Sequence, residues 1–301
     1  MNHSAALQLA FGALSPRRID TLAARHGSIE RVVAAVIGNK TDIPSVARDA
    51  IAVPAETRES ELDVLGISFI TANERGFPSG LTKVEGGPRW LFMNGRLREG
   101  PSIGIVGSRS CSAYGLELAE AYGFAAARLG WNVVSGLARG IDAAAHRGVI
   151  HVGPPDVDQG RCIAVLGCGI DVIYPKENRS LFRKVIDVGG AIVTEFPPGT
   201  RPDAWRFPTR NRIIAGLSDV VLVVEASSRG GALITARIAL DYGVPVYAVP
   251  GDVDRRTSAG TNALIRDGAF PVFGPDDLSM VLELLSPIVE HRVAGGHVVN
   301  I

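Results

Sequence analysis

The chain has 301 residues, of which 46% are hydrophobic, and this length and composition predict a sizeable buried core and argue against a disordered tail or a fibre. Its 31 basic and 31 acidic residues balance to a net charge of zero, which argues against a protein that coats nucleic acid through bulk positive charge. Three cysteines with no CxxC pair argue against a disulfide framework and a cysteine-rich zinc site.

No part of the sequence has the pattern of a membrane span or a secretory signal. Uninterrupted apolar runs of about 18 residues do not occur. The first residues, MNHSAALQLAFGALSPRR, have no basic leader followed by an apolar stretch and a small-residue cleavage site. We therefore expect a cytoplasmic protein that makes no contact with a membrane.

Residues 1–62 are predicted to form a small, all-helical N-terminal domain. Ser15 precedes a proline, as is typical of an N-cap and the first helical position, and Gly27 ends this helix. Ser28 can cap a second helix whose apolar residues recur at helical spacing. Residues 39–61 have no clear periodicity, and the role of the domain stays open.

Between residues 63 and 285, short apolar runs alternate with helical stretches. Continuous apolar strands that alternate with helices indicate a parallel sheet covered on both faces. The expected strands are Ser102–Val106, Asn132–Val134, Cys162–Leu166, Ala191–Val193, Val220–Val224 and Val244–Val249, and the clearest helices are Tyr114–Leu129 and Ala232–Tyr242. We predict an α/β fold with a doubly wound, mostly parallel, extended Rossmann-like sheet, followed by a loose tail over residues 286–301.

Six glycine-bearing turns follow these strands. They begin at Gly107, Ser135, Gly167, Thr194, Glu225 and Pro250. The carboxyl ends of the strands are where ligands bind in an open parallel sheet, and glycine lets the backbone approach a phosphate closely. A purely structural interpretation is that glycine only makes tight strand-to-helix turns. It does not explain why three of the six turns also carry an arginine.

Positive charge is concentrated locally. Six arginines and only three acidic residues occur from Arg201 to Arg237. The planar guanidinium can clamp a phosphate and stack on a base, so this segment favours a polyanionic ligand. After Val106 the chain reads Gly107-Ser108-Arg109, which is neither a dinucleotide-binding GxGxxG sequence nor a phosphate-binding P-loop, so no cofactor is predicted.

Residues suited to catalysis are few. Asp142 and His146 are four residues apart on a predicted helix and could hold a metal, but no third ligand is evident, and an aspartate favoured by the helix dipole explains the first of them. Glu195 and Glu225 both follow strands and could form a paired-carboxylate hydrolase, but neither has a nucleophile beside it. We predict no catalytic residue and no metal site.

Eight motifs in order resemble the DNA processing protein A family, over roughly residues 64–275. They are GIVGSRS at 104–110, SGLARGID at 135–142 with His146, AVLGCGID at 164–171 followed by YPKEN at 174–178, EFPP at 195–198, FPTRNRIIAGL at 207–217, GGALITA at 230–236, PGD at 250–252 and GTN at 260–262 with Gly268.

The resemblance implies a protein that binds single-stranded DNA, protects incoming strands during natural transformation, helps to load the RecA recombinase, and forms a homodimer through the Rossmann-like domain. The dimer surface is expected among Ala232–Tyr242 and Val244–Val249. The candidate residues for binding single-stranded DNA are Gly107, Ser108, Arg109, Arg139, Lys176, Asn178, Arg210, Asn211, Arg212 and Ser227. They combine backbone donors, an amine and guanidiniums along one edge of the sheet.

The sequence also departs from the family pattern. Residues 151–160 form an apparent insertion that we expect to be a surface loop. No C-terminal winged-helix module is expected, and hence no contact with double-stranded DNA through one. Two alternatives remain open on related folds: a phosphoribohydrolase-like enzyme, whose Pro-Gly-Gly-x-Gly-Thr loop is absent here, and a sensor that binds a mononucleotide.

Overall fold

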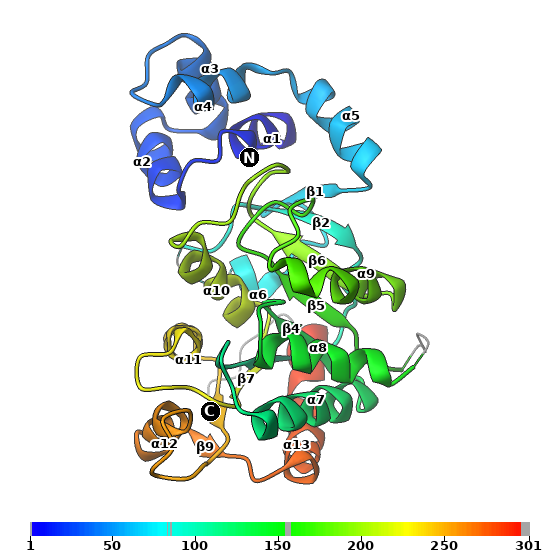
Figure 1. Ribbon diagram of the computed structural model, residues 1–301. Coiled ribbons are helices and arrows are strands. Elements are labelled where there is room, and N and C mark those ends of the chain that lie inside the picture. Colours follow the sequence, from blue (N-terminus) through cyan, green and yellow to red (C-terminus); the bar gives the residue numbers. More distant parts are fainter. Residues whose placement is uncertain (1, 83, 85, 154–157, 296–301) are drawn as a thin grey trace. The chain divides into compact units, whose positions relative to one another are not determined.

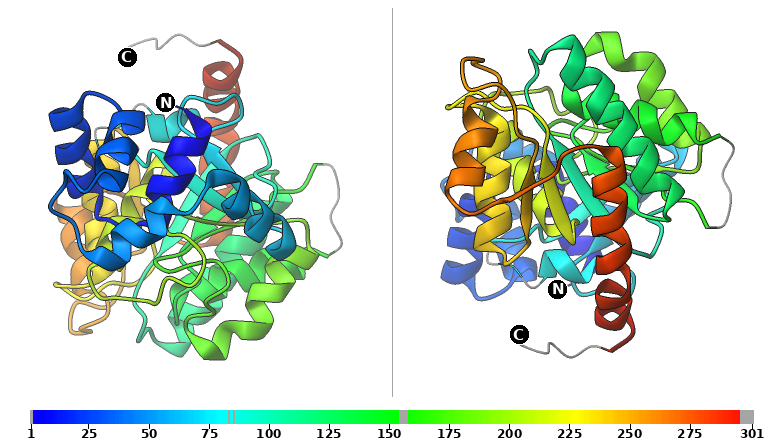
Figure 2. Two further views of the ribbon diagram at one scale, coloured as in Figure 1. Left: turned by 90° about the horizontal axis from the view of Figure 1, so that it is seen from above. Right: turned by 90° about the horizontal axis from the view of Figure 1, so that it is seen from below.

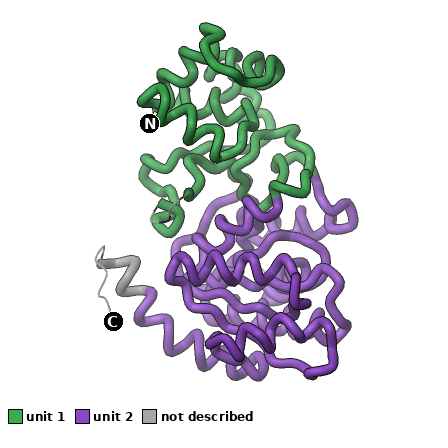
Figure 3. The backbone as a smooth tube through the Cα atoms, turned by 90° about the vertical axis from the view of Figure 1, so that its left-hand side faces the viewer, with its two compact units in different colours: residues 1–94, 166–172, 193–206 green, residues 95–165, 173–192, 207–301 purple. Residues whose placement is uncertain are grey.

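The computed structural model describes residues 2–82, 84, 86–153 and 158–295 (Figure 1). The chain divides into two compact units (Figure 3). Unit 1 comprises 1–94, 166–172 and 193–206, and unit 2 comprises 95–165, 173–192 and 207–301. The division lies further along the chain than the predicted boundary near residue 62, because the strand that follows the helices packs against two of them.

Unit 1 begins with five helices: α1 (His3–Phe11), α2 (Pro16–His26), α3 (Ile29–Ile37), α4 (Ser45–Ala52) and α5 (Ala55–Leu65). The predicted caps of α2 and α3 are confirmed, since the hydroxyls of Ser15 and Ser28 accept bonds from backbone N–H groups three residues on, and Gly27 ends α2 at φ 88°. The sequence did not predict helices α4 and α5. Each has a proline at the N-cap, which provides no side-chain hydrogen bond, and each buries only two residues.

An antiparallel strand pair, β1 (Ser68–Thr71) and β2 (Trp90–Gly95), follows, with the short helix α6 (Ser79–Thr82) between the strands. The aromatic ring of Phe92 on β2 lies 5.0 Å from Phe69 on β1 and 5.9 Å from Phe11 on α1, measured between ring centroids. The imidazole of His3 contacts the carboxylate of Glu74 at 2.7 Å. These contacts join the helices to the strand pair within unit 1.

The remaining strands confirm the predicted parallel sheet. They are β3 (Ser102–Val106), β4 (Asn132–Ser135), β5 (Cys162–Val165), β6 (Ala191–Thr194), β7 (Val220–Val223), β8 (Val246–Ala248) and β9 (Phe270–Pro271). Among the described residues, the nine strands follow the order β1-β2-β6-β5-β4-β3-β7-β8-β9. In unit 2 the neighbours from β5 to β9 pair in parallel, and their residues are buried except on β9 and at Tyr247 of β8.

Helices cover both faces of this sheet. They are α7 (Ala113–Arg128), α8 (Ile141–His151), η1 (Lys176–Asn178), α9 (Arg179–Asp187), α10 (Arg206–Gly216), α11 (Gly231–Asp241), α12 (Ala259–Arg266) and α13 (Pro275–Gly295). Figure 2 shows α7 and α8 on one face and α11 and α12 on the other. Helices α7 and α8 approach closely because Gly123 lies against the carbonyl of Ala145 and Gly148 against that of Glu120. The doubly wound α/β fold is therefore confirmed.

The prediction of a loose tail from residue 286 is wrong as far as residue 295. Helix α13 continues to Gly295, because its apolar residues Leu278, Leu282 and Val289 are buried and the helix packs against α7. Residues 296–301, and residues 154–157 of the predicted surface loop, lie outside the described residues. Every helix in the described ranges is too short or too polar to cross a lipid bilayer.

Candidate nucleic-acid interface

The first strand of the parallel sheet, β3, lies between β4 and β7, so the strand order reverses between β3 and β7. Such a point leaves a crevice at the carboxyl ends of the two strands, which is where open α/β sheets bind ligands. The backbone N–H of Ser108 after β3 donates to the carbonyl of Glu225 after β7, at 2.7 Å. The turns that carry Ser108 and Ser227 are therefore neighbours at this edge of the sheet.

The turn after β3 exposes its arginine. A Cβ atom on Gly107 would stand 2.5 Å from Cγ1 of Ile141 on α8, so glycine is required here by packing. The Ser108 hydroxyl accepts a bond from the N–H of Ser110, which tightens the turn. Arg109, the next residue, is exposed to solvent. The turn thus presents a guanidinium on a backbone held in place by its neighbours.

Two aromatic residues that were not among the candidates lie beside Arg109. The guanidinium carbon of Arg109 stands 4.7 Å from the ring centroid of Phe207 at the start of α10. Phe207 in turn lies 5.6 Å from Tyr174, with the ring planes 35° apart, and Tyr174 is 42% exposed. We call these three residues the Arg109 stack. Tyr174 and Phe207 each belong to a motif of the sequence, at 174–178 and 207–217, and this membership could have marked them as candidates. Their contact, however, arises only in the folded protein.

Two further cations occupy the neighbouring loops. Lys176 is exposed at the start of η1. Arg139, in the turn after β4, is exposed and ion-paired with Glu177. This pair raises the pKa of Arg139 and lowers the pKa of Glu177 through their shared hydrogen bond. Part of the positive charge of Arg139 is therefore balanced, whereas Lys176 presents its amine to solvent.

Asn178 uses its amide within the protein. Its Nδ2 group donates to the backbone carbonyls of Leu137 at 2.9 Å and Ala138 at 3.4 Å. Leu137 has φ 52°, a left-handed conformation that a leucine rarely adopts, and the amide of Asn178 helps to hold it. The structure thus gives Asn178 a role in shaping the turn after β4, and its donors are occupied.

Arg210 differs most from the sequence-based expectation, because it is only 3% exposed. Its Nη1 group donates to the carbonyl of Val165, and its guanidinium lies directly beneath Gly136. Asp142 is buried nearby and accepts a bond from the N–H of Gly136 at 3.1 Å. Burial raises the pKa of Asp142, while the charges of Arg210 and Arg109 oppose that rise. Arg210 is a buried cation beneath the turn, and it is not available to a phosphate in solvent.

Asn211 and Arg212 are the other candidates on α10. Arg212 is half-buried, and its charge opposes the rise that burial causes in the pKa of Tyr242. Successive helical residues point about 100° apart, so Arg210, Asn211 and Arg212 cannot all face one ligand. Asn211 is half-buried.

The residues considered for catalysis have structural contacts. The Glu225 carboxylate accepts bonds from the N–H and the hydroxyl of Ser112, the residue that caps α7. His146 is completely buried, and burial lowers its pKa to about 4, so it is neutral near pH 7. Within the described residues, no cluster of three or more His, Cys, Asp or Glu side chains could hold a metal.

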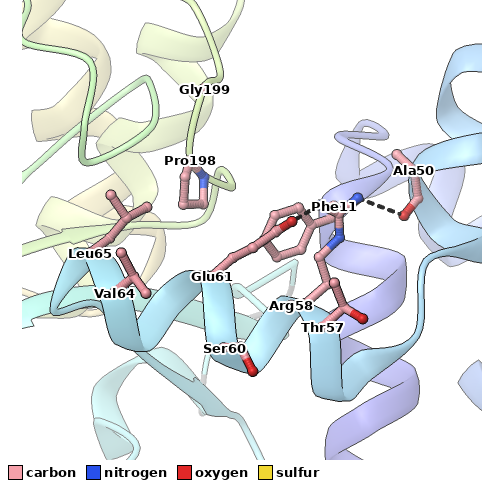
Figure 4. Close-up of a pocket in the computed structure, with 10 residues that line it drawn as sticks. All are labelled: Phe11, Ala50, Thr57, Arg58, Ser60, Glu61, Val64, Leu65, Pro198 and Gly199. Atoms are coloured by element: carbon pink, nitrogen blue, oxygen red, sulfur yellow. Dashed lines mark hydrogen bonds and ion pairs between the residues drawn. The ribbon is translucent and has the colours of Figure 1, made fainter.

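Two concave pockets contain none of the candidate residues. One, of about 790 Å³, lies in unit 1 along α5 (Figure 4), where it is lined by Phe11, Ala50, Thr57, Arg58, Ser60, Glu61, Val64, Leu65, Pro198 and Gly199. The other, of about 900 Å³, lies in unit 2 among α7, α8 and the start of α13. The candidate interface is thus distinct from both pockets.

Comparisons with known proteins agree with this fold. A sequence model of the family described as DNA recombination-mediator protein A matches residues 68–283. The solved structure of DNA processing protein A from Streptococcus pneumoniae matches with a TM-score of 0.76 and 30% identity, over 92% of this chain and 98% of that one. The structure of DNA processing protein A from Helicobacter pylori matches with a TM-score of 0.63 and 25% identity, over 72% and 96%.

Curated relatives are similar over the same region. Protein Smf of Escherichia coli is 41% identical over 212 residues, which are 70% of this chain and 55% of that protein. DNA processing protein DprA of Bacillus subtilis is 38% identical over 216 residues, which are 71% and 70%. The chain thus spans about half the length of the Smf proteins that it matches. With a match across more than two thirds of its residues, the chain belongs to the DNA recombination-mediator protein A family.

Proposed function

We propose that the chain binds single-stranded DNA as a cytoplasmic recombination mediator and breaks no bond. The Arg109 stack, next to exposed Lys176, is the observation that carries this proposal. Family membership supports it, as does the relative from Helicobacter pylori, whose structure is described as revealing a single-stranded DNA binding mode.

In the proposed contact, aromatic rings bind a base and cationic side chains bind the phosphates. A base can stack on the exposed Tyr174–Phe207 edge, and such stacking tolerates any sequence because every base has a π face. Arg109 and Lys176 would then bind the flanking phosphates, with Ser108 and Ser227 as neutral donors at the rim. Nothing in this arrangement requires a nucleophile, a metal or a cofactor.

Of the ten candidates, three act behind this surface in our proposal. Asn178 holds the turn at Leu137, Arg210 supports Gly136 from below, and Gly107 lets the first turn pack on α8. Arg212 and Asn211 contribute general positive charge or polarity from α10. Arg139 is ion-paired with Glu177 and would bind a phosphate only if that ion pair opens.

We also propose two protein partners, a RecA-type recombinase and a second copy of this chain. Helix α11 exposes two large apolar residues, Ile234 at 43% and Leu240 at 56%, which supports a homodimer surface along Ala232–Tyr242. Single-stranded DNA held without cleavage is a suitable intermediate to pass to a recombinase. Light scattering of the purified chain measures the dimer, and charged substitutions at Ile234 and Leu240 should yield a monomer.

The DNA proposal is tested with fluorescently labelled oligo-dT and anisotropy. Arg109→Ala combined with Lys176→Ala should weaken binding about 10- to 100-fold, because a stacked cation and a phosphate-binding amine are removed. The salt slope should fall by about 0.7 for each phosphate that the variant no longer binds. Arg25→Ala with Lys40→Ala removes the same charge from exposed positions on unit 1 and should leave the affinity within about twofold.

Equal affinity of the wild type and the Arg109/Lys176 double variant would refute the proposed contact. A panel of nucleotides incubated with the protein checks the enzyme alternative. Release of free base or ribose phosphate that is abolished in Glu225→Gln would replace the binding proposal with a phosphoribohydrolase-like activity. Tight binding of a mononucleotide with no gain for longer strands would favour the sensor.

A further inference from the structure

A second cluster of aromatic rings and arginine lies in unit 1, at the end of the segment between β6 and α10. The indole of Trp205 meets the ring of Phe196 edge to face, with centroids 5.9 Å apart and planes at 86°. The guanidinium carbon of Arg206 stands 4.9 Å from the Trp205 centroid and 5.4 Å from that of Phe196. Nη1 of Arg206 also donates to the carbonyl of Arg201.

Trp205 differs from the other two tryptophans of the chain in its exposure. Trp90 and Trp131 are 2% and 0% exposed and belong to the cores of their units, whereas Trp205 is 38% exposed. Because an indole buries a large apolar area when it is enclosed, a core role would leave little of it in water. Phe196 and Arg206 restrict the ring without enclosing it. Trp205 is thus a pre-positioned aromatic surface.

The covalent chain limits the distance between the Cα atoms of Trp205 and Phe207. Only Arg206 separates Trp205 from Phe207, and consecutive Cα atoms are about 3.8 Å apart, so the Cα atoms of the two aromatic residues cannot be more than about 7 Å apart. Neighbouring nucleotides of a single strand have a comparable spacing when the strand is extended.

We propose that Trp205, in unit 1, is a second base-stacking subsite for single-stranded DNA. This rests on the proposed function and extends it. Arg206 lies against the indole and, with exposed Arg201, adds positive charge against the single acid Asp203 of this segment, which suits a phosphate of the strand. Stacking on an indole is independent of base identity, so the subsite adds affinity and length to the footprint without sequence preference.

Tryptophan fluorescence reports this subsite directly, because Trp90 and Trp131 are shielded from solvent. Oligo-dT should quench the emission of the wild type in step with binding measured by anisotropy. Trp205→Phe should remove this quenching while keeping affinity within about threefold, since a ring remains. Trp205→Leu should weaken binding about 5- to 100-fold, because it removes the π face. Phe273→Leu, at a 76% exposed ring in unit 2, is the matched control and should change neither signal.

The outcomes separate this proposal from the one on which it rests. Failure of wild-type protein to bind oligo-dT would refute the proposed function itself. Binding without quenching, together with wild-type affinity of Trp205→Leu, would overturn the second subsite and leave the Arg109 contact standing. Circular dichroism establishes whether Trp205→Leu folds, and if it does not, the quenching of the wild type and its absence in Trp205→Phe still decide the question.

Discussion

The clearest test of the turn geometry is Arg210→Met. Arg210 is 3% exposed, donates to the Val165 carbonyl and lies beneath Gly136, and its charge lowers the pKa of buried Asp142 against the effect of burial. Methionine has a similar length and no charge. The substitution leaves the Asp142 carboxyl buried without a nearby buried cation.

The expected loss of stability follows from that burial. Removing one partner from a pair of buried charges destabilises a protein by about 3–5 kcal/mol, because the remaining charge is uncompensated. Replacing both by apolar residues often costs far less. We therefore expect Arg210→Met to lower the free energy of unfolding by about 3–5 kcal/mol, and Arg210→Met with Asp142→Leu to lose clearly less than the sum of the single changes.

Urea denaturation followed by circular dichroism measures these free energies, and anisotropy with oligo-dT measures affinity on the same samples. A folded Arg210→Met protein of wild-type stability with strongly reduced affinity would refute the reasoning. That result would mean that Arg210 reaches the DNA, as the sequence alone suggested. Additive effects of Arg210→Met and Asp142→Leu would show that the two groups do not interact.

Three other outcomes are expected. Burial lowers the pKa of His146 to about 4, so below about pH 6.5 the unfolded chain binds a proton that the folded chain does not. The free energy of unfolding should therefore be highest above pH 6.5 and fall by about 3 kcal/mol as the pH drops to 4. Urea titrations at several pH values measure this fall, and His146→Gln should abolish it. Ser112→Ala should lower the free energy of unfolding by about 1–2 kcal/mol, because it removes the cap of α7 and a partner of Glu225; an unchanged melting curve would contradict this. Affinity for oligo-dT should fall about 20- to 130-fold over a fourfold rise in salt if three to five phosphates are bound, and a flat salt response would exclude phosphate contacts.

Local pattern was enough to predict the parallel sheet. Most buried strands are short, mainly apolar runs followed by a glycine-bearing turn, and this signal needs no knowledge of distant residues. The same holds for the caps at Ser15 and Ser28, which act within one helical turn. The sequence did not predict elements whose local signals are weak. Helices α4 and α5 lack side-chain caps, and β1 and β2 pair with each other across 18 residues. Helix α13 is stabilised by its packing on α7.

The candidate site divides in the same way. Arg109 lies in the turn after β3 and Lys176 lies at the start of η1, and both are exposed, as expected for residues in the connections that follow strands. That they bind DNA stays a prediction. Arg210 lies on a helix, and whether a helical side chain faces solvent depends on how the helix is rotated against the sheet, which only packing fixes. For that reason the exposure of Arg210 could not be read from its motif. The contact of Tyr174 with Phe207, 33 residues further along the chain, likewise arises only when distant segments meet in the folded protein.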